Sequence, residues 1–418
     1  MLSQEVIEKL SAIFVKRVNK VNTFTLKTIA RQLKAIKNIK DLRPTEVNKL
    51  VNLLKYGGDY NKIEKQLAKM SNLNKRDIDK IFKNTAKKNQ QFAKKFYEYR
   101  NKPFIPLEQN KALLQQVEAI ADVTKNTYKN IGNTRAIGFT KKIGKRKIFV
   151  PLKEAYIEAI DEGLTAVMQG KTTMNDELRR IVKEFSSSGL KYVEFESGYH
   201  RRLDSQVAMN LKDGLALLMQ EVNLTFGEEF DANGVEISVH YNPAPDHAEV
   251  QGRQFTNEEF YKFQNDIDCY SYDISKKDHK GKFFSHEHDG HDRRSIGQYN
   301  CYHNIFPIIV GVDTPVYTEE QLQKIIDDNL QGIEYNGKHY TRYEGDQLMR
   351  KYELEIRKAK EQQIMQVEID DDEDEIFKTQ KEIKKMTKKY RQLCGLMGYK
   401  MNYEMIKVDG FSFISTNQ

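Results

Sequence analysis

The chain of 418 residues contains no tryptophan, only 8 prolines and only 3 cysteines. Because proline breaks the interior of a helix, so few prolines favour long helices. Three cysteines cannot build a disulfide framework, and an odd number is typical of a reducing compartment. No segment approaches the roughly 18 consecutive apolar residues of a membrane span. The first twenty residues alternate apolar and charged positions, so we do not expect secretion through a signal peptide.

Several motifs of known enzymes are also missing. The chain has no Gly-x-x-x-x-Gly-Lys-Ser/Thr string, which excludes a P-loop nucleotide-driven enzyme. It has no Gly-x-Ser-x-Gly elbow for a serine nucleophile. It also lacks two histidines four residues apart around a glutamate, the helical pair of many zinc proteases. Asp246-His247-Ala248-Glu249 does not complete a deaminase signature, because no Pro-Cys-x-x-Cys partner follows.

The charge is divided unevenly along the chain. Residues 1–150 contain 34 lysines and arginines against 12 acidic residues, a net charge of +22. Residues 151–418 contain 34 basic against 48 acidic residues, a net charge of −14. The total of +8 conceals this split, which indicates that the two parts have different neighbours.

Apolar residues at helical spacing dominate the first 137 residues, which we expect to form a basic helical domain. The segments with this spacing are residues 5–18, 46–54, 62–70, 75–96 and 107–131. Lysines fall on their polar faces, which is typical either of solvated helices or of electrostatic contact with a polyanion. Residues 138–150, with the string KKIGKRK, are predicted to be a linker or a basic hairpin. Lys141, Lys142, Lys145, Arg146 and Lys147 of this segment are the candidate contacts to DNA or to a partner protein.

The middle of the chain changes from helical to mixed patterns. Residues 151–225 are predicted to be helical, over 155–167, 174–185 and 203–222. Residues 226–343 are predicted to form a small α+β core: 235–241 alternate as in a strand, and 305–312 are apolar throughout. Capping boxes at Thr256 and Thr318 predict two helices. Asn336-Gly337 between two short strands predicts a type I′ hairpin.

Residues 344–418 are expected to be a charged helix to about residue 367, an acidic run over 370–375, a basic stretch over 378–391 and a C-terminal tail. We expect the acidic run to be a solvated, mobile segment. The predicted fold class is therefore mostly α with a small α+β unit.

Seven residues could ligate a metal or carry out catalysis. They are His240, His247, His286, His288, His291, Cys301 and His303. Imidazole and thiolate are the usual zinc ligands, at separations of two to five residues. Polar loop histidines without a metal are the expectation and zinc is the alternative, so no cofactor is assigned.

The strings SVHYNPAPDHAEVQGRQF, GQYNCYHNIFPIIVGV and YNGKHYTRYEGDQLMRKYELEIRKAK resemble the phage minor capsid protein 2 family. That family is related to the head-morphogenesis proteins of the Mu F type. His240, His247, Asn300, Cys301 and His303 match the pattern. Family members tend to carry Arg, Trp and Arg at the positions of Ala244, Val250 and Tyr302.

The resemblance implies a non-enzymatic minor structural protein inside the head of a tailed phage, acting in head assembly, genome packaging or delivery. Its implied partners are the portal protein, with the major capsid or scaffolding protein as further candidates, and packaged DNA held by non-specific electrostatics. The implied location is the virion interior, and the host cytoplasm during assembly, without a membrane. Two other functions stay open: a metal-dependent hydrolase or nuclease that uses the seven residues, and a non-specific DNA-binding protein.

Overall fold

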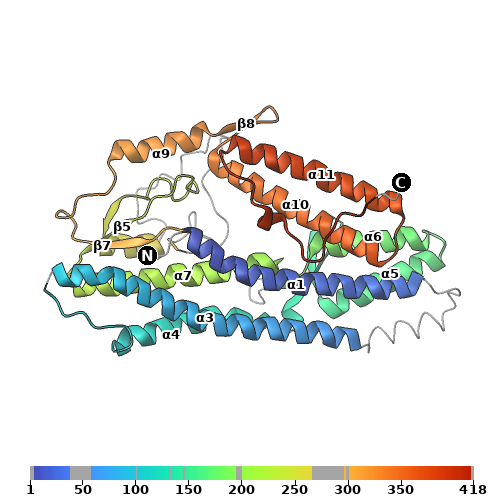
Figure 1. Cartoon of the computed structure of the whole chain (residues 1–418), viewed down its shortest axis with the longest axis horizontal. Helices are drawn as coiled ribbons and strands as arrows, with labels where there is room; N and C mark the ends of the chain where they lie inside the picture. The colour runs from blue at the N-terminus through green and yellow to red at the C-terminus, as the bar shows by residue number, and fades with distance from the viewer. Residues whose placement is uncertain are drawn as a thin grey trace. The chain divides into compact units, whose positions relative to one another are not determined.

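A computed structural model describes residues 4–37, 58–99, 101–131, 134–144, 146–193, 200–265, 296–297 and 301–415. The described chain is mostly helical with small antiparallel sheets, which confirms the predicted fold class (Figure 1). The helices are α1 (Gln4–Lys37), α3 (Gly58–Tyr99), α4 (Lys111–Ile131), α5 (Leu152–Met168), α6 (Met174–Ser188), α7 (Leu203–Glu229), α8 (Asn257–Asn265), α9 (Glu319–Gln331), α10 (Arg342–Glu368) and α11 (Glu373–Leu396). None of these helices is long and apolar enough to cross a membrane.

The chain forms two compact units, and each unit combines three separate stretches of sequence. Unit 1 consists of residues 1–12, 75–126 and 208–347. Unit 2 consists of residues 13–74, 127–207 and 348–418. The chain passes from one unit to the other within helices, so a helix such as α3 contributes residues to both.

A three-stranded sheet forms the centre of unit 1. Its strand order is β6 (Gln254–Thr256), β5 (Gly234–Ile237) and β7 (Ile305–Ile308), and all pairs are antiparallel. The sheet and α8 share one apolar core, in which Val235, Ile237 and Ile305 from the strands are at most 1% exposed. Loop residues join the same core, which ties the connecting segments to the sheet. The core residues are Val235, Ile237, Val250, Phe255, Phe260, Phe263, Ile296 and Ile305.

Helices α3, α4 and α7 pack closely in unit 1 at a glycine. A Cβ atom on Gly214 of α7 would lie 2.3 Å from Thr124 Oγ1 and 3.0 Å from Phe82 Cζ. The same helices bury a polar contact, in which the Asn89 amide donates to Asn223 Oδ1 at 3.0 Å. The Asn223 amide in turn donates to the carbonyl of Ile305 at 2.6 Å. This chain of amides connects the helices to the start of β7.

A four-stranded antiparallel sheet lies in unit 2, in the order β2 (Arg146–Pro151), β1 (Ile137–Ile143), β3 (Lys191–Val193) and β4 (His200–Arg202). The 3₁₀ turn η1 (Thr134–Ala136) leads into β1. Helix α6 covers the sheet, and Phe139 of β1 meets Phe185 edge to face at 4.5 Å between ring centroids. Residues 138–150, predicted to be a linker or a hairpin, form the β1–β2 hairpin apart from Lys145, which lies outside the described residues.

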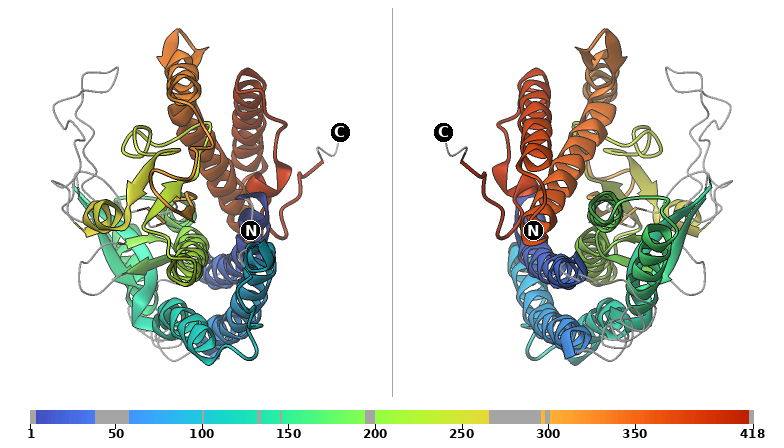
Figure 2. Two further views of the ribbon diagram at one scale, coloured as in Figure 1. Left: turned by 90° about the vertical axis from the view of Figure 1, so that its left-hand side faces the viewer. Right: turned by 90° about the vertical axis from the view of Figure 1, so that its right-hand side faces the viewer.

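Helices α10 and α11 lie alongside each other in unit 2 (Figures 1 and 2). Ile356 and Ala359 of α10 pack against Ile383 and Tyr390 of α11, and Ile406 of the short turn η3 (Tyr403–Ile406) closes this core. The Tyr390 hydroxyl donates to Glu353 at 2.6 Å inside it. The segment that follows α11 is therefore ordered against the helix pair.

The prediction of a mobile acidic run over residues 370–375 was wrong. Asp372 is the N-cap of α11, and its side chain accepts from the Asp374 amide at 2.9 Å. Asp371 pairs with Arg179 at 2.7 Å, and Asp370 pairs with Lys34 at 2.6 Å. The run ends in the first turn of a helix, where acidic residues interact favourably with the helix dipole.

Most local predictions in the α+β core are confirmed. The hairpin of β8 (Ile333–Tyr335) and β9 (Lys338–Tyr340) turns at Asn336 and Gly337, with φ angles of 53° and 71° as a type I′ turn requires. Both capping boxes form, at Thr256 and at Thr318. The predicted strand over 235–241 is shorter and ends at Ile237.

The pattern suggested separate helices over 62–70 and 75–96, but α3 runs continuously through both. The predicted helix over 46–54 lies outside the described residues.

Candidate functional site

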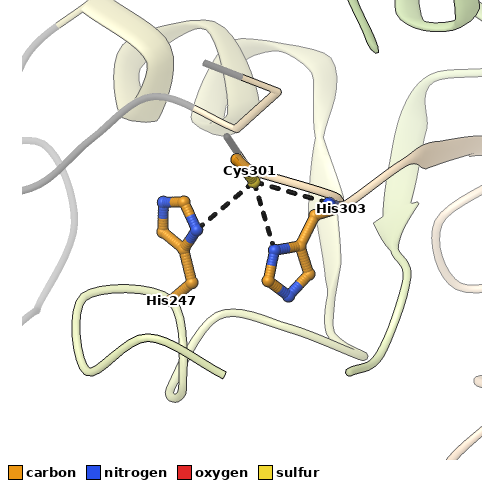
Figure 3. A group of neighbouring side chains, drawn as sticks. All are labelled: His247, Cys301 and His303. Atoms are coloured by element: carbon orange, nitrogen blue, oxygen red, sulfur yellow. Dashed lines mark hydrogen bonds between the residues drawn. The ribbon is translucent and has the colours of Figure 1, made fainter. Parts of the chain in front are cut away.

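The structure brings three of the seven predicted His/Cys residues together in unit 1. One ligand atom from each of His247, Cys301 and His303 lies within 4.8 Å of the other two (Figure 3). The three residues are 1%, 6% and 4% exposed, so the group, here called the His–Cys cluster, is closed to solvent. His240 lies beside it, with its ring centroid 4.4 Å from that of His303. His286, His288 and His291 lie outside the described residues.

Cys301 and His303 lie two positions apart in the segment that leads into β7, and Cys301 Sγ accepts from the His303 amide at 3.4 Å. The segment is fixed by Ser238, whose amide donates to the carbonyl of Asn304 at 2.8 Å and whose hydroxyl accepts from the Asn304 amide at 2.9 Å. Tyr302 faces away from the cluster, and its hydroxyl contacts Lys212 and Glu8.

His247 is held by a tight loop between β5 and β6. The loop amides of Val250 and Gln251 both donate to the carbonyl of His247, at 3.3 and 3.1 Å. Val250 anchors the loop in the sheet core. Gly252 closes it with φ of 71°, and a Cβ there would lie 2.4 Å from the Leu322 side chain. Only glycine suits this position, since it needs both a left-handed backbone and the missing side chain.

Each histidine of the cluster presents one ring nitrogen to the sulfur and the other to an oxygen. His247 Nδ1 and His303 Nδ1 lie 3.5 and 3.3 Å from Cys301 Sγ (Figure 3). On their far sides, His303 Nε2 lies 3.1 Å from Gln251 Oε1, and His247 Nε2 lies 3.7 Å from Asp246 Oδ2. Gln251 Oε1 also accepts from the His240 amide at 2.8 Å.

Two pKa values in this region depart from their usual range. Burial raises the pKa of the Cys301 thiol, but the nearby His247 ring and backbone amides at Gly297 and His303 outweigh burial, so the net shift is downward. Burial lowers the pKa of His240, against the effect of a hydrogen bond with the Tyr302 backbone. The thiol of Cys301 and the neighbouring imidazole of His240 thus both have a pKa below the usual value.

The described members of the predicted basic contacts, Lys141, Lys142, Arg146 and Lys147, lie on the β1–β2 hairpin of unit 2. Lys141 pairs with Glu158 at 3.2 Å and with Glu162 at 2.5 Å. Lys142 and Lys147 are exposed and lie directly opposite each other across the two strands. Directly opposed like charges destabilise a strand pair. These two lysines therefore present positive charge that the described part of the chain does not neutralise.

A second basic surface lies on the part of α3 that belongs to unit 1. Three exposed lysines there have no acidic partner among the described residues, and they are Lys80, Lys88 and Lys95. At about 100° per residue they fall within an arc of about 80° around the helix. Other lysines of this stretch are paired, such as Lys83 with Glu118 at 3.0 Å and Lys87 with Glu108 at 2.6 Å. The three unpaired residues are here called the α3 lysine row.

Asp246 and Gln251 support the cluster and were not among the predicted residues. Asp246 adjoins His247 in sequence, and Gln251 follows it by four positions. Carboxylates and amides near a candidate histidine are the sequence feature that would have identified both residues.

Comparison with known proteins gives one match. Neither the curated proteins nor the solved structures contain a match to this chain. The family model described as "Phage minor capsid protein 2" matches residues 4–394, which is nearly the whole chain. The protein therefore belongs to the phage minor capsid protein 2 family.

Proposed function

We propose that the protein is a portal-associated minor component of a tailed-phage head, located inside the capsid and acting in head assembly and in packaging or delivery of the genome. The observation that carries this proposal is the family match over residues 4–394, which includes both units. A match of that length concerns the whole chain and not one borrowed domain. The family is one of structural capsid proteins, so other head proteins are its partners.

The distribution of charge suggests how such a protein would meet DNA. The interior of a filled head is dense with phosphate, and cationic side chains bind there by releasing counterions. The α3 lysine row and the opposed pair Lys142 and Lys147 supply uncompensated positive charge for this contact. An acidic surface of the portal would attract the same residues. Recognition in either case depends on charge and not on DNA sequence.

A catalytic role for the His–Cys cluster has less support. A catalytic zinc site keeps an open position for water or substrate. The three clustered side chains are at most 6% exposed, which does not favour access of a substrate to them. We therefore assign no catalytic residue, and we place the metal-dependent hydrolase behind the structural role.

Quantitative mass spectrometry of purified particles tests the location in the head. Full and emptied heads should be compared, with the portal and major capsid proteins as internal standards. We expect a small, fixed ratio of this protein to the portal protein in full heads. A lower ratio in emptied heads is expected if the protein leaves with the DNA. Absence from full heads would overturn the proposal.

Salt dependence tests the electrostatic part separately. The affinity of the full-length protein for duplex DNA and for purified portal rings should fall as salt rises, with a slope of about −0.9 per phosphate neutralised on DNA. A variant that replaces Lys80, Lys88 and Lys95 with glutamine should bind more weakly and with a smaller slope. Binding to both partners that ignores salt would contradict the electrostatic mechanism while leaving the virion location intact.

A further inference from the structure

We propose that His247, Cys301 and His303 are three protein ligands of one zinc ion, which ties the loop between β5 and β6 to the segment that enters β7. The inference concerns a site within unit 1 and does not depend on where the protein lies in the virion. It departs from the sequence expectation of loop histidines without a metal, because the fold brings together residues that are 54 positions apart.

The distances suit a tetrahedral zinc site. Zinc–sulfur and zinc–imidazole bonds of about 2.3 and 2.0 Å at a tetrahedral angle place the sulfur and each nitrogen about 3.5 Å apart. The observed distances from Cys301 Sγ are 3.5 Å to His247 Nδ1 and 3.3 Å to His303 Nδ1. Both sulfur–nitrogen distances therefore match those that such an ion imposes, and all three ligand atoms lie within 4.8 Å of one another.

The hydrogen bonds identify which nitrogen of His303 carries its proton. The backbone amide of His240 can only donate, so the atom of Gln251 that it meets must be the carbonyl oxygen Oε1. That same oxygen faces His303 Nε2 at 3.1 Å, so Nε2 must be the nitrogen that donates. In a neutral imidazole the other nitrogen then has a lone pair. The lone pair of His303 Nδ1 is directed at Cys301 Sγ, another atom rich in electrons (Figure 3).

His247 has the same arrangement on its other side. Its Nε2 faces the buried carboxylate of Asp246, and its Nδ1 faces the sulfur. Zinc-bound histidines usually direct their second ring nitrogen at a carboxylate or a carbonyl, which fixes the ring and raises its basicity. Both histidines of the cluster have such an outer oxygen. The amide of His303 also donates to Cys301 Sγ at 3.4 Å, a contact that favours a thiolate.

Without a metal, each of the two contacts between Cys301 Sγ and a histidine Nδ1 needs a proton between its atoms. One S–H group can donate to only one of the two Nδ1 atoms. The other contact then needs a proton on His247 Nδ1, which would donate to the sulfur. A single cation satisfies both nitrogens and the thiolate at once. His240 Nε2, buried without a hydrogen-bond partner next to His303, adds a further unsatisfied lone pair or N–H at this place.

The ligand set selects the metal and its role. One thiolate with two imidazoles suits zinc, whereas calcium and magnesium prefer oxygen ligands. Three protein ligands leave the fourth tetrahedral position to another ligand, and the burial of all three side chains favours a structural ion over a catalytic one. It would fix the turn that contains His247 against residues 301–303, next to the three-stranded sheet.

Metal content of the full-length protein is the first test. The protein should be produced in zinc-supplemented cells, freed of any affinity tag and purified without chelator. Elemental analysis should give about one zinc per chain, as expected for a single structural site. A folded wild-type protein that contains no metal and binds none on titration would overturn the proposal and establish the protonated arrangement instead.

Cobalt and matched variants then locate the ion. Zinc should be removed by a chelator, retention of helix checked by circular dichroism, and Co²⁺ added. We expect the intense visible bands of tetrahedral cobalt and a sulfur-to-cobalt charge-transfer band. Cys301→Ser should lose the charge-transfer band and at least tenfold in metal affinity, and His303→Asn should lose a similar factor in affinity.

Two substitutions away from the cluster are the controls. Cys394→Ala removes a buried cysteine of unit 2, and His339→Asn removes an exposed histidine of unit 1 that contacts Glu334. Both should keep full metal content. If Cys301→Ser or His303→Asn fails to fold, the cobalt spectra of the wild type and of the two controls still provide a test. A charge-transfer band that persists in Cys394→Ala shows that the thiolate ligand is a cysteine other than Cys394. Zinc retained by folded Cys301→Ser and His303→Asn would place the ion at other residues and overturn the proposal.

Discussion

Unit 2 buries a network of formal charges, whereas unit 1 buries the imidazole and thiol groups of the His–Cys cluster. In unit 2, Arg202 donates to Glu361 at 2.9 Å and to Asp204 at 3.3 Å, and all three side chains are at most 5% exposed. Asn22 donates to Glu361 and the Ser205 amide to Asp204, so further lone pairs are satisfied. Arg357 approaches Asp204 at 3.5 Å. Opposite charges from the same chain complete this network.

The cluster in unit 1 differs because its inner atoms repel one another unless a proton or a metal lies between them. Burial makes the lack of both a proton and a metal costly, because the buried nitrogen and sulfur atoms have lost their hydration. A buried charge network can therefore be structural with no outside component, whereas the convergent atoms of the His–Cys cluster fit the proposed zinc ion.

Removing the central charge of the unit 2 network should have the largest effect. Arg202→Met leaves Glu361 and Asp204 buried without their main partner, and breaking a buried pair in this way costs about 3–5 kcal/mol. Hydrogen exchange of α10 amides measures the loss of unfolding free energy locally. Glu404→Gln, which breaks the exposed pair with Lys407, is the control and should cost about 0–1 kcal/mol. Equal effects of the two substitutions would contradict the assignment of a structural network.

Removing the metal should have a comparable effect in unit 1 alone. At a free zinc concentration a thousand times the dissociation constant, binding stabilises the folded state by about 4 kcal/mol. Chelation should therefore speed amide exchange in the loop of residues 238–253 and in β7 and leave α11 unchanged. If restoring zinc slows amide exchange in no part of unit 1, the ion does not stabilise this unit.

Acid should weaken unit 2 through Asp204. Burial raises the pKa of this carboxyl, but Arg202 and Arg357 outweigh burial and lower it from 3.8 to about 2. Because the folded-state pKa is depressed, the stabilisation is complete above pH 3.8 and is lost as the pH falls towards 2. The shift corresponds to about 2 kcal/mol. Asp204→Asn should remove this part of the pH dependence of unfolding. A variant that keeps the wild-type acid transition would show that other carboxylates control it.

Local patterns in the sequence were sufficient for the hairpin at Asn336 and Gly337 and for both capping boxes, because these structures depend on neighbouring residues. The break expected between residues 70 and 75 was wrong for a physical reason. Ser71 and Asn74 are polar but buried, since Ser71 donates to the carbonyl of Tyr128 and Asn74 accepts from Arg17. A helix can therefore continue through a polar segment when distant residues supply the partners.

The candidate site was partly predictable in the same sense. Cys301 and His303 were both among the seven candidate residues. Their convergence with His247 depends on the pairing of β5 with β7 and on the loop closed by Gly252, and neither is encoded in the spacing. The acidic run at 370–375 shows the same limit, because its partners Arg179 and Lys34 are remote in sequence.

The smallest expected effect on stability concerns the basic hairpin, where stability and binding should change in opposite directions. Lys142→Thr removes the repulsion from Lys147 across the strand pair, so unit 2 should gain a few tenths of a kcal/mol. The same change should weaken binding of the full chain to DNA and reduce the salt slope by about 1. Lys141→Thr is the matched control, because that lysine is already paired with Glu158 and Glu162 and should contribute little to DNA binding. Thermal unfolding and binding titrations at several salt concentrations measure the two effects. If Lys142→Thr lowers stability and leaves DNA affinity unchanged, Lys142 stabilises the hairpin and does not form an anion contact.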